Sequence, residues 1–535
     1  MKPSTTIMAL AIVFAFLVIS GGFSDATSSA NPCAKPSTPV GSAAEPPNAA
    51  AGSKANGSLQ DDLKTLCGCV DTFGPPAPVV DPAVLPVDVS LEDNLKCKSD
   101  VECPNANGCC QPCFDCFGWQ LFIALNWPAN SAGQPDPGKP FGEPSEYSDV
   151  VWQTYKNAFE VFGDRQPAPW GVNEPHDLQL NSAVIKDTLL KYDLQSDHNW
   201  LTDEAGNVVR YEIRVNRDEF QYILKNDLWH QEGLYKHVTA GAGIELPSQK
   251  SEFGDVGAME VKAAWRIIPE ARRAYFEANY KVAHAKVFDP ISKGWNDKDV
   301  ALVGLHIIKK TPKSPQWVWS TFEHKDNAPV DGDLGLGRQW NFFNPELFRT
   351  DPNYKPNYLA PPYKIPTNKP VQVFRVRQAS SDDVDASKIN EAMHRLIAAR
   401  YPNSVWQNYN LISVQWPRDP AKPDPKLQKS LPSGQPRPRV LANTAMETYQ
   451  QVKNSGGAAG LSPGISNDQG QEKNFPADDV GKSSCISCHR ISAVTPKFVN
   501  HPSAKGWTTD YSTLFFKAGV KKPLPNSMKR RTRRG

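Results

Sequence analysis

The chain has 535 residues, a formal net charge of +2, 39% hydrophobic residues and 48 prolines. This length favours several domains or one large domain with insertions, and the composition predicts a globular core with long proline-rich connections rather than a fully disordered chain. The small net charge gives no electrostatic support for a nucleic-acid partner or for an acidic membrane surface.

Residues 1–26 have the pattern of a secretory signal peptide. Lys2 precedes the apolar run MALAIVFAFLVI at residues 8–19, which is shorter than the roughly 20 apolar residues that span a bilayer. Small residues at Ser24 and Ala26 fit cleavage after Ala26. We therefore expect a periplasmic or otherwise exported protein whose mature chain has no membrane span. An uncleaved membrane anchor is the alternative.

A flexible Ala/Ser/Pro-rich tether is predicted over residues 27–96. Nine cysteines lie in the N-terminal part of the chain: Cys33, Cys67, Cys69, Cys97, Cys103, Cys109, Cys110, Cys113 and Cys116. The last three have the beginning of an iron–sulfur pattern, but its fourth ligand and following proline are absent. Disulfides are the better interpretation in an oxidising compartment, with one thiol left free or paired with another chain.

The pattern predicts a large α+β domain over residues 97–438, with a predominantly antiparallel sheet. Helices are expected at residues 114–127, 148–162 and 387–400, the last with Ser387 as its N-cap. Strands are expected at residues 259–267, 301–308, 316–323, 371–377 and 405–416. The short link at 311–315 predicts an antiparallel hairpin.

Residues 485–489 read Cys-Ile-Ser-Cys-His. Two thiols separated by two residues on a helical turn can reach both vinyl groups of a haem, and the following histidine then lies under the iron. In this motif, and in about 60 residues around it, the chain resembles the c-type cytochromes. The resemblance implies one covalent haem c held by Cys485 and Cys488, His489 as an iron ligand, single-electron transfer and a redox partner protein.

Two other interpretations of the motif are weaker. A thioredoxin-like redox pair requires a strand-to-helix junction, whereas a Gly/Ser/Asn-rich loop precedes Cys485. A zinc site requires a second Cys/His pair, and His501 stands alone. Only 46 residues follow His489. We therefore expect a C-terminal haem-binding segment at 439–528 that packs on the large domain, with helices at 444–453 and 508–518, followed by a basic tail at 529–535.

The sequence does not identify the sixth iron ligand, for which the candidates are Met528, His501, Met446, His306 and His324. The expected hairpin register places His306 opposite Trp319 and too far from His324 for a metal pair. His306 is predicted to be a satisfied core histidine, and His324 a residue that could serve a pocket.

Three functions stay open. The preferred one is a single-electron carrier, and the others are a haem enzyme such as a peroxidase and a haem-based sensor. The sequence does not indicate a small-molecule substrate.

Overall fold

The computed structural model describes the core of the chain and parts of its C-terminal region. The described residues are 85–86, 88–89, 111–163, 165–171, 178–180, 200–289, 294–330, 337–350, 356–357, 372–376, 386–417, 420, 436–438, 441–451, 485–490, 492–494 and 507–519. The chain divides into two compact units, Met1–Pro47 and Asn48–Gly535, and all of these residues belong to the second. The predicted signal peptide, the basic tail and nearly all of the tether lie outside the described residues.

Eight α-helices, five 3-10 helices and eleven strands make up the described regular structure. The α-helices are α4 (Gln111–Leu125), α5 (Ala158–Val161), α6 (Arg217–Lys225), α7 (Gln231–Thr239), α8 (Arg273–Asn279), α9 (Pro345–Thr350), α10 (Ser387–Arg400) and α11 (Cys485–His489). The 3-10 helices are η1 (Val151–Thr154), η4 (Glu270–Arg272), η5 (Val405–Asn408), η6 (Thr448–Gln450) and η8 (Leu514–Lys517). The strands are β1 (Lys156–Asn157), β2 (Leu178–Leu180), β3 (Arg210–Val215), β4 (Met259–Ile267), β5 (Val282–Asp289), β6 (Gly294–Lys309), β7 (Val318–His324), β8 (Tyr409–Pro417), β9 (Pro436–Arg437), β10 (Ala493–Val494) and β11 (Trp507–Thr508).

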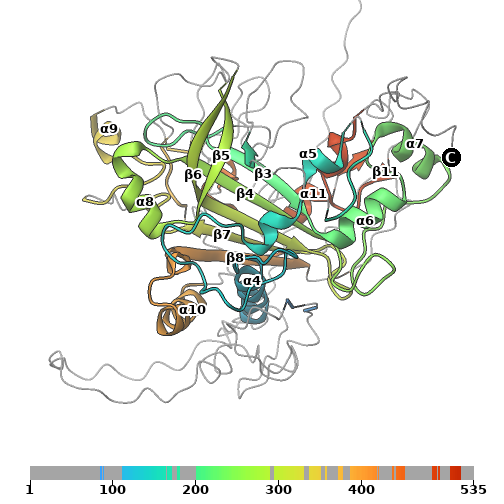
Figure 1. The fold of residues 1–535 in the computed structure, drawn as a ribbon, viewed down its shortest axis with the longest axis horizontal. Helices are drawn as coiled ribbons and strands as arrows, with labels where there is room; N and C mark the ends of the chain where they lie inside the picture. The colour runs from blue at the N-terminus through green and yellow to red at the C-terminus, as the bar shows by residue number, and fades with distance from the viewer. Residues whose placement is uncertain are drawn as a thin grey trace, which may run out of the picture. The chain divides into compact units, whose positions relative to one another are not determined.

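One nine-stranded sheet organises these elements (Figure 1). Its main path runs β1-β3-β4-β6-β7-β8-β9, and β5 pairs with both β6 and β2. Every neighbouring pair is antiparallel except β2 with β5. The predicted α+β fold with a predominantly antiparallel sheet is therefore confirmed. No helix in the described part of the chain is both long and apolar enough to cross a membrane.

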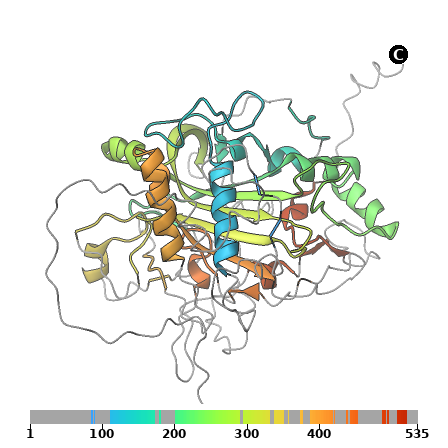
Figure 2. The ribbon, with the colours of Figure 1, turned by 90° about the horizontal axis from the view of Figure 1, so that it is seen from below.

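Helices α4 and α10 cover the first face of the sheet (Figure 2). Helix α4 is buried on nearly all sides, as its apolar sequence predicts, and the rings of Phe122 and Phe322 stack with centroids 4.2 Å apart. Gly118 permits this close approach, because a Cβ at that position would lie 2.6 Å from a methyl group of Val414. Cys116, on the same helix, is fully buried and disulfide-bonded.

Two apolar clusters lie on the second face of the sheet. The first, here called the α11 cluster, includes Val215, Ile308, Trp319, Ile486, Tyr511 and Phe515. The second, here called the 445–449 cluster, includes Tyr211, Ala264, Ala445, Met446 and Tyr449. The C-terminal segment thus packs on the large sheet, as the sequence analysis expected, and α11 lies near α5 and α6 (Figure 1).

The most periodic segments were predicted best. The bounds of β4 and α10 are those expected, although the N-cap of α10 is Ala386 rather than Ser387 and no side chain caps the helix. The predicted helix at 148–162 is wrong. Residues 151–154 form η1, Lys156 pairs with Val215 of β3, and only 158–161 are α-helical. Pairing with the edge of the sheet prevails here over helical periodicity.

Three further predictions need correction. Of residues 371–377, the described part forms only an isolated bridge between Arg375 and Val330. Of residues 405–416, the first four form η5 before β8 begins. The expected helix at 508–518 is instead Thr508 at the end of β11 followed by turns and η8.

Candidate haem-attachment site

The Cys-Ile-Ser-Cys-His motif forms the single helical turn α11 on the second face of the sheet. The buried Ile486 fastens this turn, and its backbone N–H donates to Gln415 Oε1 of β8 at 2.9 Å. Cys485, Cys488 and His489 are only half-buried, and neither cysteine is in a disulfide. The turn is therefore held to the sheet by its apolar residue, while Cys485, Cys488 and His489 are only partly covered.

His489 is held so that one ring nitrogen remains available. Its Nδ1 lies 2.9 Å from the carbonyl oxygen of Tyr511, and a carbonyl can only accept a hydrogen bond, so Nδ1 carries the proton. The lone pair is then on Nε2, to which no described residue donates a hydrogen bond. The ring of Trp319 packs against the imidazole at 4.6 Å between centroids. Burial lowers the pKa of His489 to about 4, so the ring is neutral at pH 7.

A row of paired residues, partly exposed on β3, β4 and β6 and buried at Thr321 of β7, crosses the sheet between the two apolar clusters. Ile213 pairs with Lys262, Lys262 with His306, and His306 with Thr321, on four neighbouring strands. Directly paired residues point to the same face. Ile213 is the one residue of β3 that is not buried, and His306 is the one between Val300 and Lys309 of β6. Exposure in the middle of a large sheet indicates a gap in the covering layer.

Glu447 borders this row from the 441–451 segment. Its Oε2 lies 3.4 Å from Nε2 of His306 and accepts a 2.9 Å hydrogen bond from the backbone of Asn443. The charges of Lys262, Glu447 and His306 all influence the pKa of His489. The pKa of the Cys485 thiol is raised mainly by burial and further by the negative charge of Glu447. The row and the motif therefore belong to one site.

The segment carrying Glu447 is not the helix predicted at 444–453. The backbone N–H of Thr444 donates to the buried carboxylate of Glu323 at 2.7 Å, and its hydroxyl donates to the same carboxylate. Because Thr444 is engaged with Glu323, it cannot cap a helix, and only η6 forms beyond it. Glu447 bonds back to Asn443 instead, which directs its carboxylate toward the row.

The structure reverses the predicted roles of the two histidines. His324 is fully buried, accepts a hydrogen bond from the backbone of Asp326, contacts the carbonyl of Asn279 at 3.1 Å and stacks on Tyr280. It is the satisfied core histidine. The side chain of His306 is 16% exposed, and its buried Nε2 makes no hydrogen bond.

The hairpin register differs by two residues from the expected one, because His306 is opposite Thr321 and Ile308 is opposite Trp319.

Three candidates for the sixth iron ligand remain. Met446 is fully buried in the 445–449 cluster, with its terminal methyl against Gly304 of β6. Met528 and His501 lie outside the described residues.

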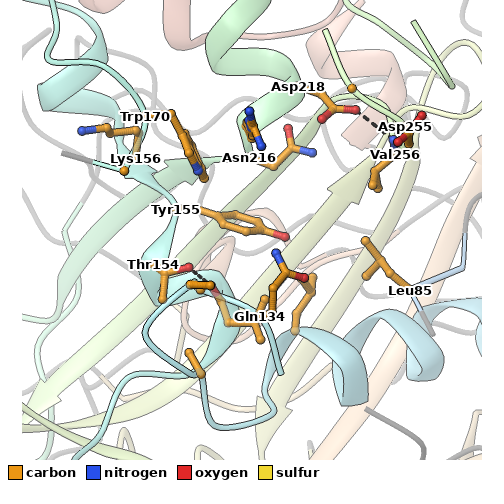
Figure 3. Close-up of a pocket in the computed structure, with 18 of the residues that line it drawn as sticks. Leu85, Gln134, Thr154, Tyr155, Lys156, Trp170, Asn216, Asp218, Asp255 and Val256 are labelled. Carbon is orange, nitrogen blue, oxygen red and sulfur yellow. Dashed lines mark hydrogen bonds between the residues drawn. The ribbon is translucent and has the colours of Figure 1, made fainter. Parts of the chain in front are cut away.

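A separate cavity of about 1040 Å³ opens beside β1 (Figure 3). Tyr155 and Trp170 form an aromatic wall, with ring centroids 6.4 Å apart, opposite the loop that carries Gln134. Asp218 borders it and holds the loop at 251–257 by accepting from the backbone of Val256 at 2.9 Å. The motif at residues 485–489 is not part of its lining. This cavity has the size and mixed lining of a small-molecule site.

The residues of the attachment site fit a covalent haem in three respects. Two thiols and one neutral imidazole belong to a single helical turn, a carbonyl fixes the tautomer that leaves Nε2 for iron, and the adjoining sheet face carries partly exposed residues. Glu447, Lys262 and Trp319 were not identified from the sequence, because only the sheet register and the 441–451 segment bring them to the motif. Comparisons with protein-family models, with curated proteins and with solved structures each gave no match.

Proposed function

We propose that this chain is an exported monohaem c-type cytochrome that transfers single electrons. Cys485 and Cys488 would bind the haem through thioether bonds, and His489 Nε2 would coordinate the iron. The haem supplies the exchange of one electron between the ferric and ferrous states. The predicted signal peptide supports export, because haem is attached to such proteins outside the cytoplasm.

One observation carries the proposal. His489 Nδ1 faces the Tyr511 carbonyl at 2.9 Å, and this contact orients the imidazole as the second shell of a metal-binding histidine does. A thioredoxin-like pair would not need a histidine held in this way. The motif also lies on a helical turn that packs on a sheet in which, among the described strands, every neighbouring pair but one is antiparallel.

The test is the Cys485→Ser, Cys488→Ser double variant. When it is expressed with the haem-attachment machinery, we expect it to lose all haem that survives denaturing electrophoresis, because no thioether can form. The wild-type chain should retain haem staining under the same conditions. Full staining of the double variant would contradict the proposal.

A haem enzyme is the second candidate, and one observation favours it. His306 and Glu447 are a histidine and a carboxylate 3.4 Å apart beside the motif, and such a pair can act as acid and base if the iron has an open face. The cavity beside β1 would then be a candidate substrate site. A ferric spectrum with a high-spin component that shifts on adding cyanide or peroxide would favour this function over electron transfer.

A redox partner protein is part of the leading proposal, since an electron carrier must meet its donor and acceptor. The basic tail at 529–535 could increase the rate of encounter with an acidic partner. Deleting residues 529–535 should then weaken the salt dependence of electron transfer to an acidic redox protein, measured by stopped-flow absorbance. An unchanged salt dependence would remove the tail from the proposal.

A further inference from the structure

We infer that His306 would be a second protein ligand of the haem iron, in addition to His489. This inference rests on the proposed function, since it requires a haem on α11. It would make the iron six-coordinate through two imidazoles, and it commits the site to electron transfer rather than to chemistry at an open iron face.

The first support is the position of His306. It lies in the middle of β6, and its partner residues Lys262 and Thr321 fix its backbone on both sides. A central strand holds a side chain more rigidly than a loop does, as a ligand site requires. Its side chain lies in the partly exposed row, two positions along β6 from Ile308, which pairs with Trp319, and the ring of Trp319 packs on His489.

The second support is the state of the imidazole ring. A coordinating histidine uses one nitrogen for the metal and gives the N–H of the other to a carboxylate or carbonyl. His306 has a carboxylate beside it, Glu447, and its buried Nε2 has no hydrogen bond. A buried polar atom without a partner destabilises the fold, so this nitrogen is available for a ligand. Rotation of the ring allows either nitrogen to face Glu447, which leaves the other for iron.

The third support is the comparison with the other candidates that the structure describes. His324 already has a contact at each ring nitrogen, stacks on Tyr280 and meets Tyr409 edge to face. The sulfur-bearing side chain of Met446 is enclosed in the 445–449 cluster. Of these three, His306 alone combines partial exposure with a ring nitrogen, Nε2, that makes no hydrogen bond.

The experiment compares the full-length wild type with His306→Ala by ferric EPR and visible absorption after haem attachment. We expect a low-spin ferric spectrum of two nitrogen ligands in the wild type, unchanged by cyanide at low concentration, and a ferrous absorption spectrum that carbon monoxide does not change. The variant should keep its covalent haem but become high-spin and bind both ligands. Added imidazole should restore the low-spin spectrum, which would show that the fold survives.

Two matched variants complete the test. His284→Ala removes an exposed histidine of β5 that contacts Asp299 and should leave the spectrum unchanged. Glu447→Gln should stay low-spin, with a higher reduction potential because a negative charge near the iron is lost. A low-spin spectrum in His306→Ala, or a high-spin wild type, would overturn the assignment of His306 without affecting covalent attachment. Absence of covalent haem in the wild type would instead overturn the proposed function.

Discussion

At the scale of single residues, burial raises the pKa of the Asp115 carboxyl group in α4. Its carboxylate lies inside the protein, where Oδ1 accepts from Gln111 Nε2 at 2.9 Å and from the backbone of Val414 at 3.0 Å. Burial raises its pKa from 3.8 to about 7 despite these bonds. Between about pH 4 and pH 7, the carboxyl group of Asp115 is therefore protonated in the folded chain and ionised in the unfolded chain.

This difference predicts a pH dependence of stability. As the pH rises from about 4 to 7, the contribution of Asp115 to the free energy of unfolding should fall, by up to about 4 kcal/mol. Asp115→Asn keeps an oxygen acceptor but cannot ionise, so its stability should decline less over this range. Urea denaturation of both proteins at pH 5 and pH 8 measures the effect. Parallel declines in the two proteins would show that Asp115 does not titrate as described.

The residues of the site could be predicted only in part. The spacing of Cys485, Cys488 and His489 defines a chemical unit within five residues, so the sequence suffices to identify it. The state of His306 depends on Glu447, which is 141 residues away in the chain and reaches it only because Glu323 engages Thr444. No local pattern reveals such a contact, and the histidines were accordingly assigned the wrong way round.

At the scale of elements, the packing of α4 on the sheet depends on a glycine. Gly118 weakens the helix by about 1 kcal/mol relative to alanine, yet a Cβ there would meet Val414 at 2.6 Å and Ser320 Oγ at 3.0 Å. Because valine is branched at Cβ, its side chain has few accessible rotamers and cannot easily move away from a new methyl group. Steric demand therefore outweighs helix propensity at this position.

Gly118→Ala should consequently destabilise the protein by about 1–3 kcal/mol, the usual cost of overpacking a core. The double variant with Val414→Ala removes the opposing methyl groups and should recover part of this loss, as a double-mutant cycle by chemical denaturation would show. A Gly118→Ala variant as stable as the wild type would mean that α4 does not pack this closely on β8.

The elements differ in how far the sequence predicts them. Strand β4 and helix α10 are long and strongly periodic, so one periodicity dominates and their bounds follow from it. Residues 148–162 carry a helical pattern, but Lys156 pairs with β3 at the sheet edge and interrupts it. The hairpin of β6 and β7 was expected, whereas its register was displaced by two residues because β6 ends at Lys309 and β7 begins at Val318, which centres the turn between Lys313 and Ser314.

At the scale of the whole molecule, one large sheet carries different structures on its two faces. One face supports α4 and α10 over a continuous apolar core. The other face carries the α11 cluster and the 445–449 cluster with the partly exposed row between them. The α+β class follows from the alternation of strand and helix patterns. The division of the second face does not, because it depends on where two C-terminal segments pack.

This arrangement gives the large domain a role in the proposed function. The buried Ile486 holds the motif turn on the sheet, and its backbone N–H donates to Gln415 of β8. Under the proposed function, the sheet would supply part of the surroundings of the haem through Trp319, Lys262 and His306. The proposed cytochrome is therefore a property of the whole fold and not of a detachable C-terminal domain.

The central claim is that residues 485–489 carry a covalent haem. Its most direct test is mass spectrometry of the peptide containing Cys485 and Cys488, released by protease from protein produced in cells with haem-attachment machinery. We predict that this peptide carries the mass of one haem and absorbs visible light. A colourless peptide with two free thiols or a disulfide, from cells that attach haem to a known cytochrome c, would contradict it.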